Sequence, residues 1–297
     1  MLTHHHPSPV APARVVVLGA RGFVASSLLA HLAAANVSTL GLSSADLDLT
    51  APAAAEALAA RLRPDDALVF VSALTPDRGK DVATLMRNLQ MGQHVCQALV
   101  TRPCAHVVYL STDAVYHDDA NPVTERACAQ PSSFHGVMHM VRERMLIETL
   151  RPSKTPLALI RPSLLYGAGD THNGYGPNRF ARLAVAGQPI SLFGGGEEQR
   201  DHIAIEDVSR LLGLVLAHRS EGVLNVATGT SHAFADLARL AVELARSASA
   251  VEATPRANPI THRHFDIAAT VEAFPTFRFV PVREGLAAMI AALVARA

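Results

Sequence analysis

Two histidines with i, i+4 spacing, His135 and His139, are suited by type and position to proton transfer. On a helix, residues so spaced lie on one face, and both rings would point the same way. An imidazole with its ordinary pKa of ~6.5 donates or accepts a proton near neutral pH. The spacing also suits a metal pair, for which His172 is a candidate third ligand. We expect acid–base chemistry and assign no metal, with metal-assisted chemistry kept as an alternative.

Gly19, Gly22 and Ala25 have the spacing of a pyrophosphate-binding turn. The first glycine allows a tight turn after a strand, the second lets the backbone approach a phosphate, and the small third residue lets helix and strand pack closely. The helix that begins at Phe23 and Val24 would add free N–H groups and the positive end of its dipole. An ordinary strand–helix turn is the other interpretation, but the place after the first strand of a βαβ pattern favours binding of NAD or NADP.

The end of the second expected strand bears on the choice between the two cofactors. NAD-binding proteins usually carry an acidic residue there, which binds the ribose 2′-hydroxyl. In this chain Ser43 and Ser44 follow the strand. Arg21, inside the glycine turn, would instead face a 2′-phosphate through its planar guanidinium, unless it points to solvent. The pattern therefore favours NADP over NAD.

Short apolar strands alternate with helices through the first half of the chain. The β-branched run at residues 15–18 is typical of a fully buried strand. This alternation predicts an α/β fold with a doubly wound parallel sheet of the Rossmann type. The expected strands are residues 15–18, 37–42, 67–71, 106–110 and 157–160, and the expected helices are residues 23–35, 53–62, 81–99 and 136–150.

The alternation ends after Pro162, and Gly, Pro and Asn gather in residues 167–178. We therefore expect a dinucleotide-binding domain followed by a smaller C-terminal lobe that mainly binds substrate. One apolar stretch of that lobe is expected to return to the main sheet. The expected division is a flexible leader at 1–12, the dinucleotide-binding domain at 13–166 and the lobe at 167–297, with 222–227 as the returning stretch.

The composition excludes several classes of protein. Lys+Arg and Asp+Glu both number 26, which argues against a nucleic-acid or membrane-surface partner. The three cysteines have neither metal-ligand nor redox spacing, as suits a reducing cytosol. No apolar stretch reaches the length of a membrane span, and the N-terminal segment does not resemble a signal peptide. We expect a cytoplasmic protein whose partner is a small molecule.

Several motifs follow one another in an order that is far more specific than any one of them. They are Gly19-x-x-Gly22-x-x-Ala25, Asp46-Leu47-Asp48-Leu49-Thr50, Val71-Ser72-Ala73, Asn88, and the stretches 110–116, 161–167, 192–196 and 200–208. Together they resemble the extended short-chain dehydrogenase/reductase family, the NAD(P)-dependent epimerases and dehydratases that mostly act on nucleotide sugars. The resemblance runs from about Arg14 to the last helix.

The resemblance implies cofactor contacts beyond the glycine turn. It places Asp48 and Leu49 beside the adenine, and Ser72 and Ala73 along the middle of the cofactor. Pro162 would border the nicotinamide.

The resemblance also implies residues that hold the diphosphate of a sugar nucleotide. These are Asn178 and Arg200, and an arginine suits this task because its donors match phosphate oxygens in pairs. An ion pair with a nearby acid is the alternative role for Arg200; the candidates are Glu197, Glu198 and Asp201.

The sequence departs from the family at the catalytic pair. The family uses Tyr-x-x-x-Lys on one helix, and here His135 and His139 stand at those positions. Thr112 remains where the resemblance puts the donor to the substrate oxygen. Asp113 resembles the acid of nucleotide-sugar 4,6-dehydratases, but Ala114 replaces its glutamate partner, which argues against that mechanism.

We therefore expect an NAD(P)-dependent oxidoreductase or epimerase for a nucleotide sugar, with His135 in proton transfer and His139 at the ribose. Tyr175 is a further candidate acid. The alternative is a protein of the same fold that binds the cofactor and transfers no hydride. A homodimer formed by the helices at 81–99 and 136–150 is expected from the resemblance.

Overall fold

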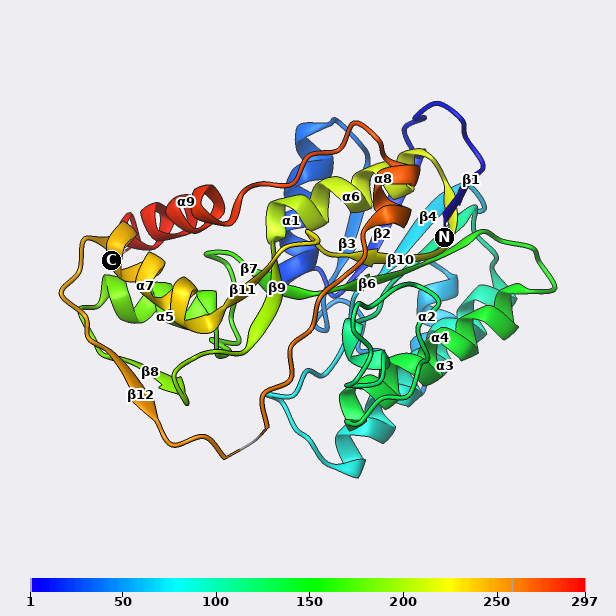
Figure 1. Ribbon diagram of the computed structural model, residues 1–297. Helices are drawn as coiled ribbons and strands as arrows, with labels where there is room; N and C mark the ends of the chain where they lie inside the picture. The colour runs from blue at the N-terminus through cyan, green and yellow to red at the C-terminus, as the bar shows by residue number, and fades with distance from the viewer. Residues whose placement is uncertain (1, 258, 297) are drawn as a thin grey trace.

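A seven-stranded sheet forms the centre of the computed structural model, which describes residues 2–257 and 259–296 (Figure 1). Its strands run in the order β1-β10-β6-β5-β4-β2-β3, and all are parallel except β1, which pairs antiparallel with β10. This topology confirms the predicted doubly wound sheet. The bounds are β1 Leu2–His4, β2 Arg14–Leu18, β3 Thr39–Leu42, β4 Asp66–Phe70, β5 His106–Leu110, β6 Leu157–Pro162 and β10 Ser220–Val226.

Helices cover both faces of this sheet, and β2 shows why the sequence folds this way. Its residues are almost completely buried and alternate between two cores: Val15 and Val17 face one layer of helices, while Val16 and Leu18 face the other. The first layer contains α1 (Phe23–Ala34), α6 (Ile205–Ala217) and α8 (Ala268–Ala273). The second contains α2 (Ala54–Ala59), α3 (Val82–Thr101) and α4 (Phe134–Leu150).

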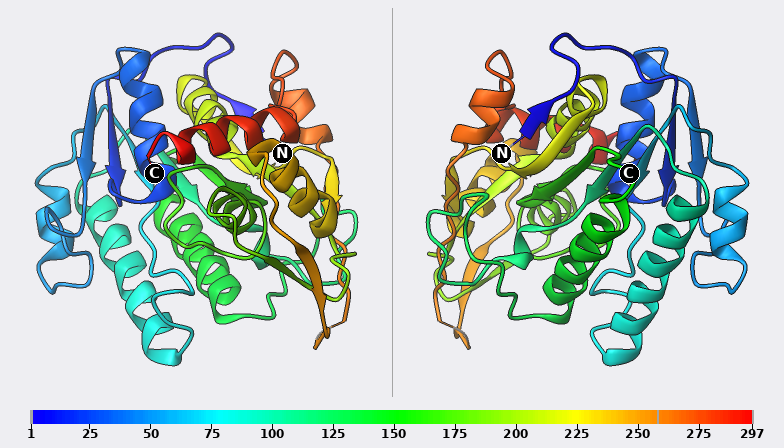
Figure 2. Two further views of the ribbon diagram at one scale, coloured as in Figure 1. Left: turned by 90° about the vertical axis from the view of Figure 1, so that its left-hand side faces the viewer. Right: turned by 90° about the vertical axis from the view of Figure 1, so that its right-hand side faces the viewer.

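A smaller lobe lies beside the carboxyl ends of the parallel strands, at the left of Figure 1 and facing the viewer in the left panel of Figure 2. It has its own core, to which Phe180, Phe234 and Leu286 contribute. The lobe contains one sheet of β7 (Leu164–Tyr166), β9 (Gln199–Ala204) and β11 (Ser231–Ala233), a second of β8 (Ile190–Phe193) and β12 (Val251–Thr254), and helices α5 (Pro177–Val185), α7 (Phe234–Ala245) and α9 (Val282–Val294). Strand β10 leaves the lobe and pairs with β6, where the sequence placed residues 222–227.

The N-terminal segment differs from its prediction as a flexible leader. Residues 2–4 form β1, and His4 ties this strand to two other elements. Its Nδ1 lies 2.8 Å from Ser220 Oγ, and its Nε2 donates to the Ala273 carbonyl at 3.0 Å. The ring also packs against Phe274, with centroids 5.2 Å apart. The edge of β10 offers free backbone groups, and the leader pairs with them.

The helices differ in length and in the polarity of their faces. None of those in residues 2–257 and 259–296 is long and apolar enough to cross a membrane.

Candidate functional site

Gly19 closes a turn that only glycine fits. Its φ is +93°, and a Cβ there would lie 2.9 Å from Ser72 Oγ and 3.1 Å from Ser72 Cα and N. Its N–H donates to the Leu42 carbonyl at 2.8 Å, which ties the turn to the end of β3. The ends of β2, β3 and β4 therefore meet at this residue.

The helix start beyond that turn is open. Gly22 is the N-cap of α1 and, among the described residues, no side chain caps the first amides, which belong to Phe23 and Val24. The ring of Phe23 packs beside Gly167 and Gly169 of the opposite lobe. Free amides at the positive end of a helix, beside a turn that begins and ends with glycine, fit the pyrophosphate of a nicotinamide dinucleotide.

Arg21 and the end of β3 frame the expected ribose position. Arg21 is exposed, and its charge contributes to the lowered pKa of the Asp46 carboxyl. The main cause of that lowering is the pair of hydrogen bonds that Asp46 accepts from the hydroxyl and N–H of Ser43, at 2.6 and 2.9 Å. Asp46 is an acid near the end of β3 that the sequence analysis named in a motif but did not consider for the ribose.

Asp48 and Leu49 shape the loop where the resemblance places the adenine. The Asp48 carboxylate accepts from the N–H and hydroxyl of Thr50, at 2.9 and 2.7 Å. The side chain of Leu49 is buried in the core under α3, and its carbonyl lies 2.8 Å from His94 Nδ1. Any contact of Leu49 with an adenine would therefore come from its backbone rather than its side chain.

The loop after β4, which carries Ser72 and Ala73, is held from α3 and α4. The side-chain amide of Asn88 accepts from the Leu74 N–H at 2.8 Å and donates to the Leu74 carbonyl at 2.9 Å. Arg142 donates from Nη1 to the Ser72 carbonyl at 2.8 Å. The resemblance motif included Asn88 but gave Arg142 no role.

His135 and His139 lie together at the start of α4, as their spacing predicted. Their rings meet edge to face, with centroids 4.7 Å apart. His135 is partly exposed, whereas His139 is buried and its Nδ1 lies 2.7 Å from the Tyr109 hydroxyl. Burial lowers the pKa of both rings, and the charge of Arg142 lowers it further. Both imidazoles are therefore neutral at neutral pH.

Thr112 lies on a turn that packs against the first turn of α4, which carries His135. It caps the short 3₁₀ helix η1 (Asp113–Val115), with its hydroxyl accepting from the Ala114 N–H at 3.2 Å. Gly136, next to His135, has no room for a Cβ because the Ala114 carbonyl occupies that space. The close approach brings the turn after β5 against the first turn of α4.

Asp113 is engaged by an arginine that the sequence analysis missed. Arg263 donates to the Asp113 carboxylate at 3.3 Å and to its carbonyl at 3.0 Å. Burial raises the pKa of Asp113, and the Arg263 guanidinium opposes that rise. No sequence motif indicated this contact, because 150 residues separate the pair.

Pro162 ends β6 at the same edge of the sheet, in register with Val226 of β10. The next residue, Ser163, donates from its hydroxyl to Asp201 at 3.0 Å. Asp201, buried, also accepts from the N–H and hydroxyl of Thr228. This carboxylate thus holds together β6, β9 and the loop after β10.

Asn178 and Arg200 are not free in the positions expected for a diphosphate. The Asn178 amide accepts from the Gly167 N–H at 2.9 Å and donates to the Leu165 carbonyl at 3.0 Å. Arg200 is paired with Glu198, Nε to Oε1 at 2.8 Å, which is the alternative considered for it. Asn178 therefore fixes a loop, with one N–H left over. A ligand would have to compete with Glu198 for Arg200.

Two further side chains depart from their candidate roles. His172 Nδ1 lies 2.7 Å from the Asp77 carboxylate, and within the described ranges no group of three or more His, Cys, Asp or Glu could hold a metal ion. Tyr175 stacks on Phe193 in the smaller lobe, with centroids 4.5 Å apart, and its hydroxyl accepts from the Phe193 N–H. Its place among lobe aromatics argues against a role as the replacement acid.

Comparison with known proteins places this geometry in a family. The model of the NAD dependent epimerase/dehydratase family matches residues 15–227. A dTDP-L-rhamnose 4-epimerase of Burkholderia thailandensis is 29% identical over 121 residues, which are 39% of this chain and 33% of that protein. The aligned part thus spans about a third of that relative.

Solved structures match over nearly the whole chain. A UDP-glucose 4-epimerase of Thermus thermophilus, in complex with NAD, is 20% identical and has a TM-score of 0.81, covering 94% of this chain and 98% of that one. A GDP-L-fucose synthetase of Naegleria fowleri bound to NADP is 14% identical and has a TM-score of 0.87, covering 100% and 98%. At these identities the likeness establishes a shared fold.

Proposed function

The chain belongs to the NAD dependent epimerase/dehydratase family, and on that premise we propose that it is a nicotinamide-dependent enzyme acting on a carbinol or carbonyl carbon of a nucleotide sugar. One observation carries the proposal. The neutral His135, the Thr112 turn and the loop of Ser72 meet at the sheet edge where the open turn of Gly19 begins α1. A group that can transfer a proton, a hydroxyl donor and a turn that can bind phosphate thus lie at one edge of the sheet. This is the edge formed by the carboxyl ends of the strands, where open α/β sheets bind their ligands.

The residues of the site divide the work as follows. Gly22 and the first amides of α1 would hold the pyrophosphate, and Ser72 and Pro162 would border the rest of the cofactor. When bound, the nicotinamide accepts or supplies hydride. Thr112 donates a hydrogen bond to the substrate oxygen, and His135 takes the proton of a substrate hydroxyl or returns one to it. Because this role needs the neutral imidazole, oxidation should slow as the pH falls through the lowered pKa of His135.

NADP is the proposed form of the cofactor. The support is Arg21, which is exposed in the glycine turn, makes no ion pair within the described part of the chain, and offers a planar fork to a 2′-phosphate.

The alternative, a cofactor-bound protein without hydride transfer, also has an observation in its favour. His139 is buried and bound to Tyr109, so it has less freedom to reach a ribose than a long, mobile side chain would have. On this alternative the site recognises a nucleotide sugar and leaves the redox state of the cofactor unchanged.

The test is absorbance of the reduced nicotinamide band with the purified chain, each cofactor, and a panel of UDP-, dTDP- and GDP-sugars. We expect turnover with one of them, and H135F should lower it by about 10²- to 10⁴-fold. The matched control is F134H/H135F, which moves the imidazole by one residue along the helix and should stay inactive. Tight cofactor binding with no spectral change for any sugar would establish the alternative.

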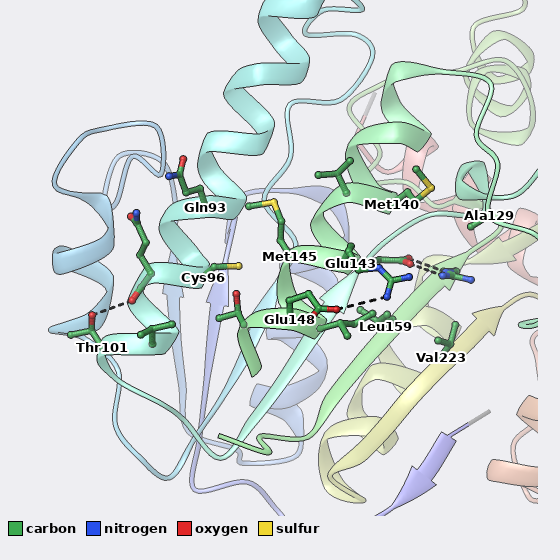
Figure 3. A pocket seen from close by; sticks show the side chains of 17 residues that line it. Gln93, Cys96, Thr101, Ala129, Met140, Glu143, Met145, Glu148, Leu159 and Val223 are labelled. Carbon is green, nitrogen blue, oxygen red and sulfur yellow. Dashed lines mark hydrogen bonds and ion pairs between the residues drawn. The ribbon is translucent and has the colours of Figure 1, made fainter. Parts of the chain in front are cut away.

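A homodimer is proposed from a groove on the outer side of α3 and α4. The groove has a volume of about 1110 Å³, and its lining is mainly apolar, with Val100, Met145 and Val223 among its residues (Figure 3). The side chain of Val100 is 69% exposed. V100E should convert a dimer to a monomer in sedimentation equilibrium, whereas V294E, at a similarly exposed valine of α9, should leave the mass unchanged. A monomeric wild type would refute the proposal.

A further inference from the structure

Arg142 is a completely buried cation without a carboxylate partner in the described residues. Its guanidinium donates only to neutral oxygens: to the Asn88 carbonyl at 2.9 Å from Nε and 2.5 Å from Nη2, to Asn88 Oδ1 at 3.2 Å, and to the Ser72 carbonyl at 2.8 Å. Burying an unpaired charge costs several kcal/mol even when it is hydrogen-bonded. A side chain held at such a cost calls for a reason beyond packing.

The surrounding elements are built around this side chain. Gly92 of α3 faces it, and a Cβ there would lie 3.0 Å from Arg142 Cγ. Asn88, one helical turn before Gly92, supplies two of the acceptors. The guanidinium lies over the Phe70 ring, 4.8 Å from its centroid, where a ring face attracts a cation. The α3–α4 contact thus has a dedicated place for a positive charge.

Tyr109 lies between the Arg142 guanidinium and His139. The Tyr109 hydroxyl lies 2.7 Å from His139 Nδ1, and the nearby Arg142 opposes the burial that raises the pKa of the phenol. A guanidinium has donors and no acceptor, so the lone pairs of the Tyr109 oxygen face Arg142 and its O–H points to His139. Nδ1 of His139 then accepts, and the ring carries its hydrogen on Nε2.

We infer that Arg142 is a positioning residue that, through Tyr109, fixes His139 as the Nε2–H tautomer and keeps His139 and His135 uncharged. For catalysis the inference rests on the function proposed above: a neutral His135 is a proton acceptor at neutral pH. The lowered pKa of both rings supports this assignment, since burial is its largest cause and the Arg142 charge contributes to it.

The other ionisable groups around the two rings do not reverse this effect. On α4, Glu143 is neutralised by Arg161 at 2.8 Å. From the loops opposite, His172 acts in the same direction as Arg142 on the pKa of His135 and lies 2.7 Å from the Asp77 carboxylate. Further groups lie on neighbouring elements: Lys80 and Asp81 on the rim of the pocket that includes His135, and Cys96 on α3 near Arg142.

Nitrogen NMR of the imidazoles tests the inference without cofactor or substrate, so its failure is distinct from failure of the proposed function. Long-range ¹H–¹⁵N spectra of the full chain, assigned with H135Q and H139Q, report tautomer and protonation at each ring. We expect His139 as Nε2–H, both rings neutral at neutral pH, and a pKa below the ordinary imidazole value for each. R142Q, which keeps a donor but loses the charge, should raise the pKa of His139 by about one unit or more. R142K keeps a cation and should stay near wild type, and Y109F should lose the tautomer preference.

A charge exchange provides the second measurement. H139K puts a second cation beside Arg142 and should destabilise the chain, whereas H139K/R142Q should recover part of that loss in urea unfolding. An Nδ1–H tautomer of His139 in the wild type, or titrations that R142Q leaves unchanged, would overturn the inference. So would equal destabilisation by H139K in both backgrounds.

Discussion

Replacing Gly19 by alanine tests the phosphate turn most directly. The residue has a φ of +93°, which costs an L-residue about 1–2 kcal/mol. The new Cβ would lie 3.1 Å from the Cα and N of Ser72, backbone atoms that cannot rotate away, and such overpacking costs about 1–3 kcal/mol more. The free energy of unfolding should therefore fall by about 2–5 kcal/mol. Relief of this contact moves the turn relative to the end of β4. At least one amide at the start of α1 should then lose its hydrogen bond to phosphate.

The loss of one charge-assisted hydrogen bond, about 1.5–3 kcal/mol, corresponds to a rise in Kd of about 10- to 100-fold. The chain contains no tryptophan, so the fluorescence of a reduced nicotinamide reports binding without interference from that residue. Gly187 is the matched control, with a φ of +66° and open space around its Cβ position. G187A should lower the free energy of unfolding only by the cost of a positive φ, about 1–2 kcal/mol, and should leave the Kd for the cofactor unchanged. If G19A is destabilised as expected and yet binds the cofactor as tightly as wild type, the phosphates lie elsewhere.

Three further outcomes are expected. R21A should weaken NADPH by about tenfold or more and leave NADH unchanged in calorimetry, while equal losses for both would argue against a 2′-phosphate contact. E143Q removes the carboxylate from the buried bidentate pair with Arg161 and should lower the free energy of unfolding by about 3–5 kcal/mol in urea, whereas a change under about 1 kcal/mol would refute a buried pair. Burial lowers the pKa of His106 to about 4. Between pH ~6.5, the pKa in the unfolded chain, and pH ~4, the unfolded chain binds more protons than the folded one. The free energy of unfolding is therefore full above pH ~6.5 and decreases as the pH is lowered below that value. At pH 5 this histidine should cost about 2 kcal/mol, a loss that H106Q removes and that equal pH slopes in the two proteins would contradict.

The parallel sheet could be predicted because its strands are buried on both faces. A run such as residues 15–18 has no polar alternation, and only a strand between two layers of helices tolerates that pattern. The pairing of β1 could not be predicted in this way. A strand of three residues gives no periodicity, and its partner β10 lies more than two hundred residues away. Its stability comes from contacts such as His4 with Ser220 and Phe274, which the local sequence does not contain.

In the candidate site, too, the features set by local spacing could be predicted, and those set by contacts between distant segments could not. His135 and His139 could be paired from the sequence because helical spacing fixes which side chains share a face. Tyr109 and Arg263 could not be assigned, since their partners belong to other elements and no local pattern relates them. The resemblance implied Asn178 as a diphosphate ligand; the bonds of its amide to the loop backbone, which leave one N–H, could not be predicted from that motif.

On the proposed function, the position of the positive charge would let a site without the family's lysine transfer protons. A lysine at residue 139 would put its charge next to His135, the residue assigned to proton transfer. In this chain the charge lies one turn further along α4, over the Phe70 ring, and it acts on the imidazoles through the Tyr109 hydroxyl. A cation so placed disfavours protonated His139 and His135 alike, and burial acts in the same direction. Because a neutral imidazole already accepts a proton near neutral pH, His135 does not need the adjacent cation by which a tyrosine is made acidic enough. On this proposal the absence of the lysine and the burial of Arg142 belong to one arrangement. The H135Y/H139K variant should therefore show no turnover in the reduced nicotinamide band while Arg142 keeps its charge.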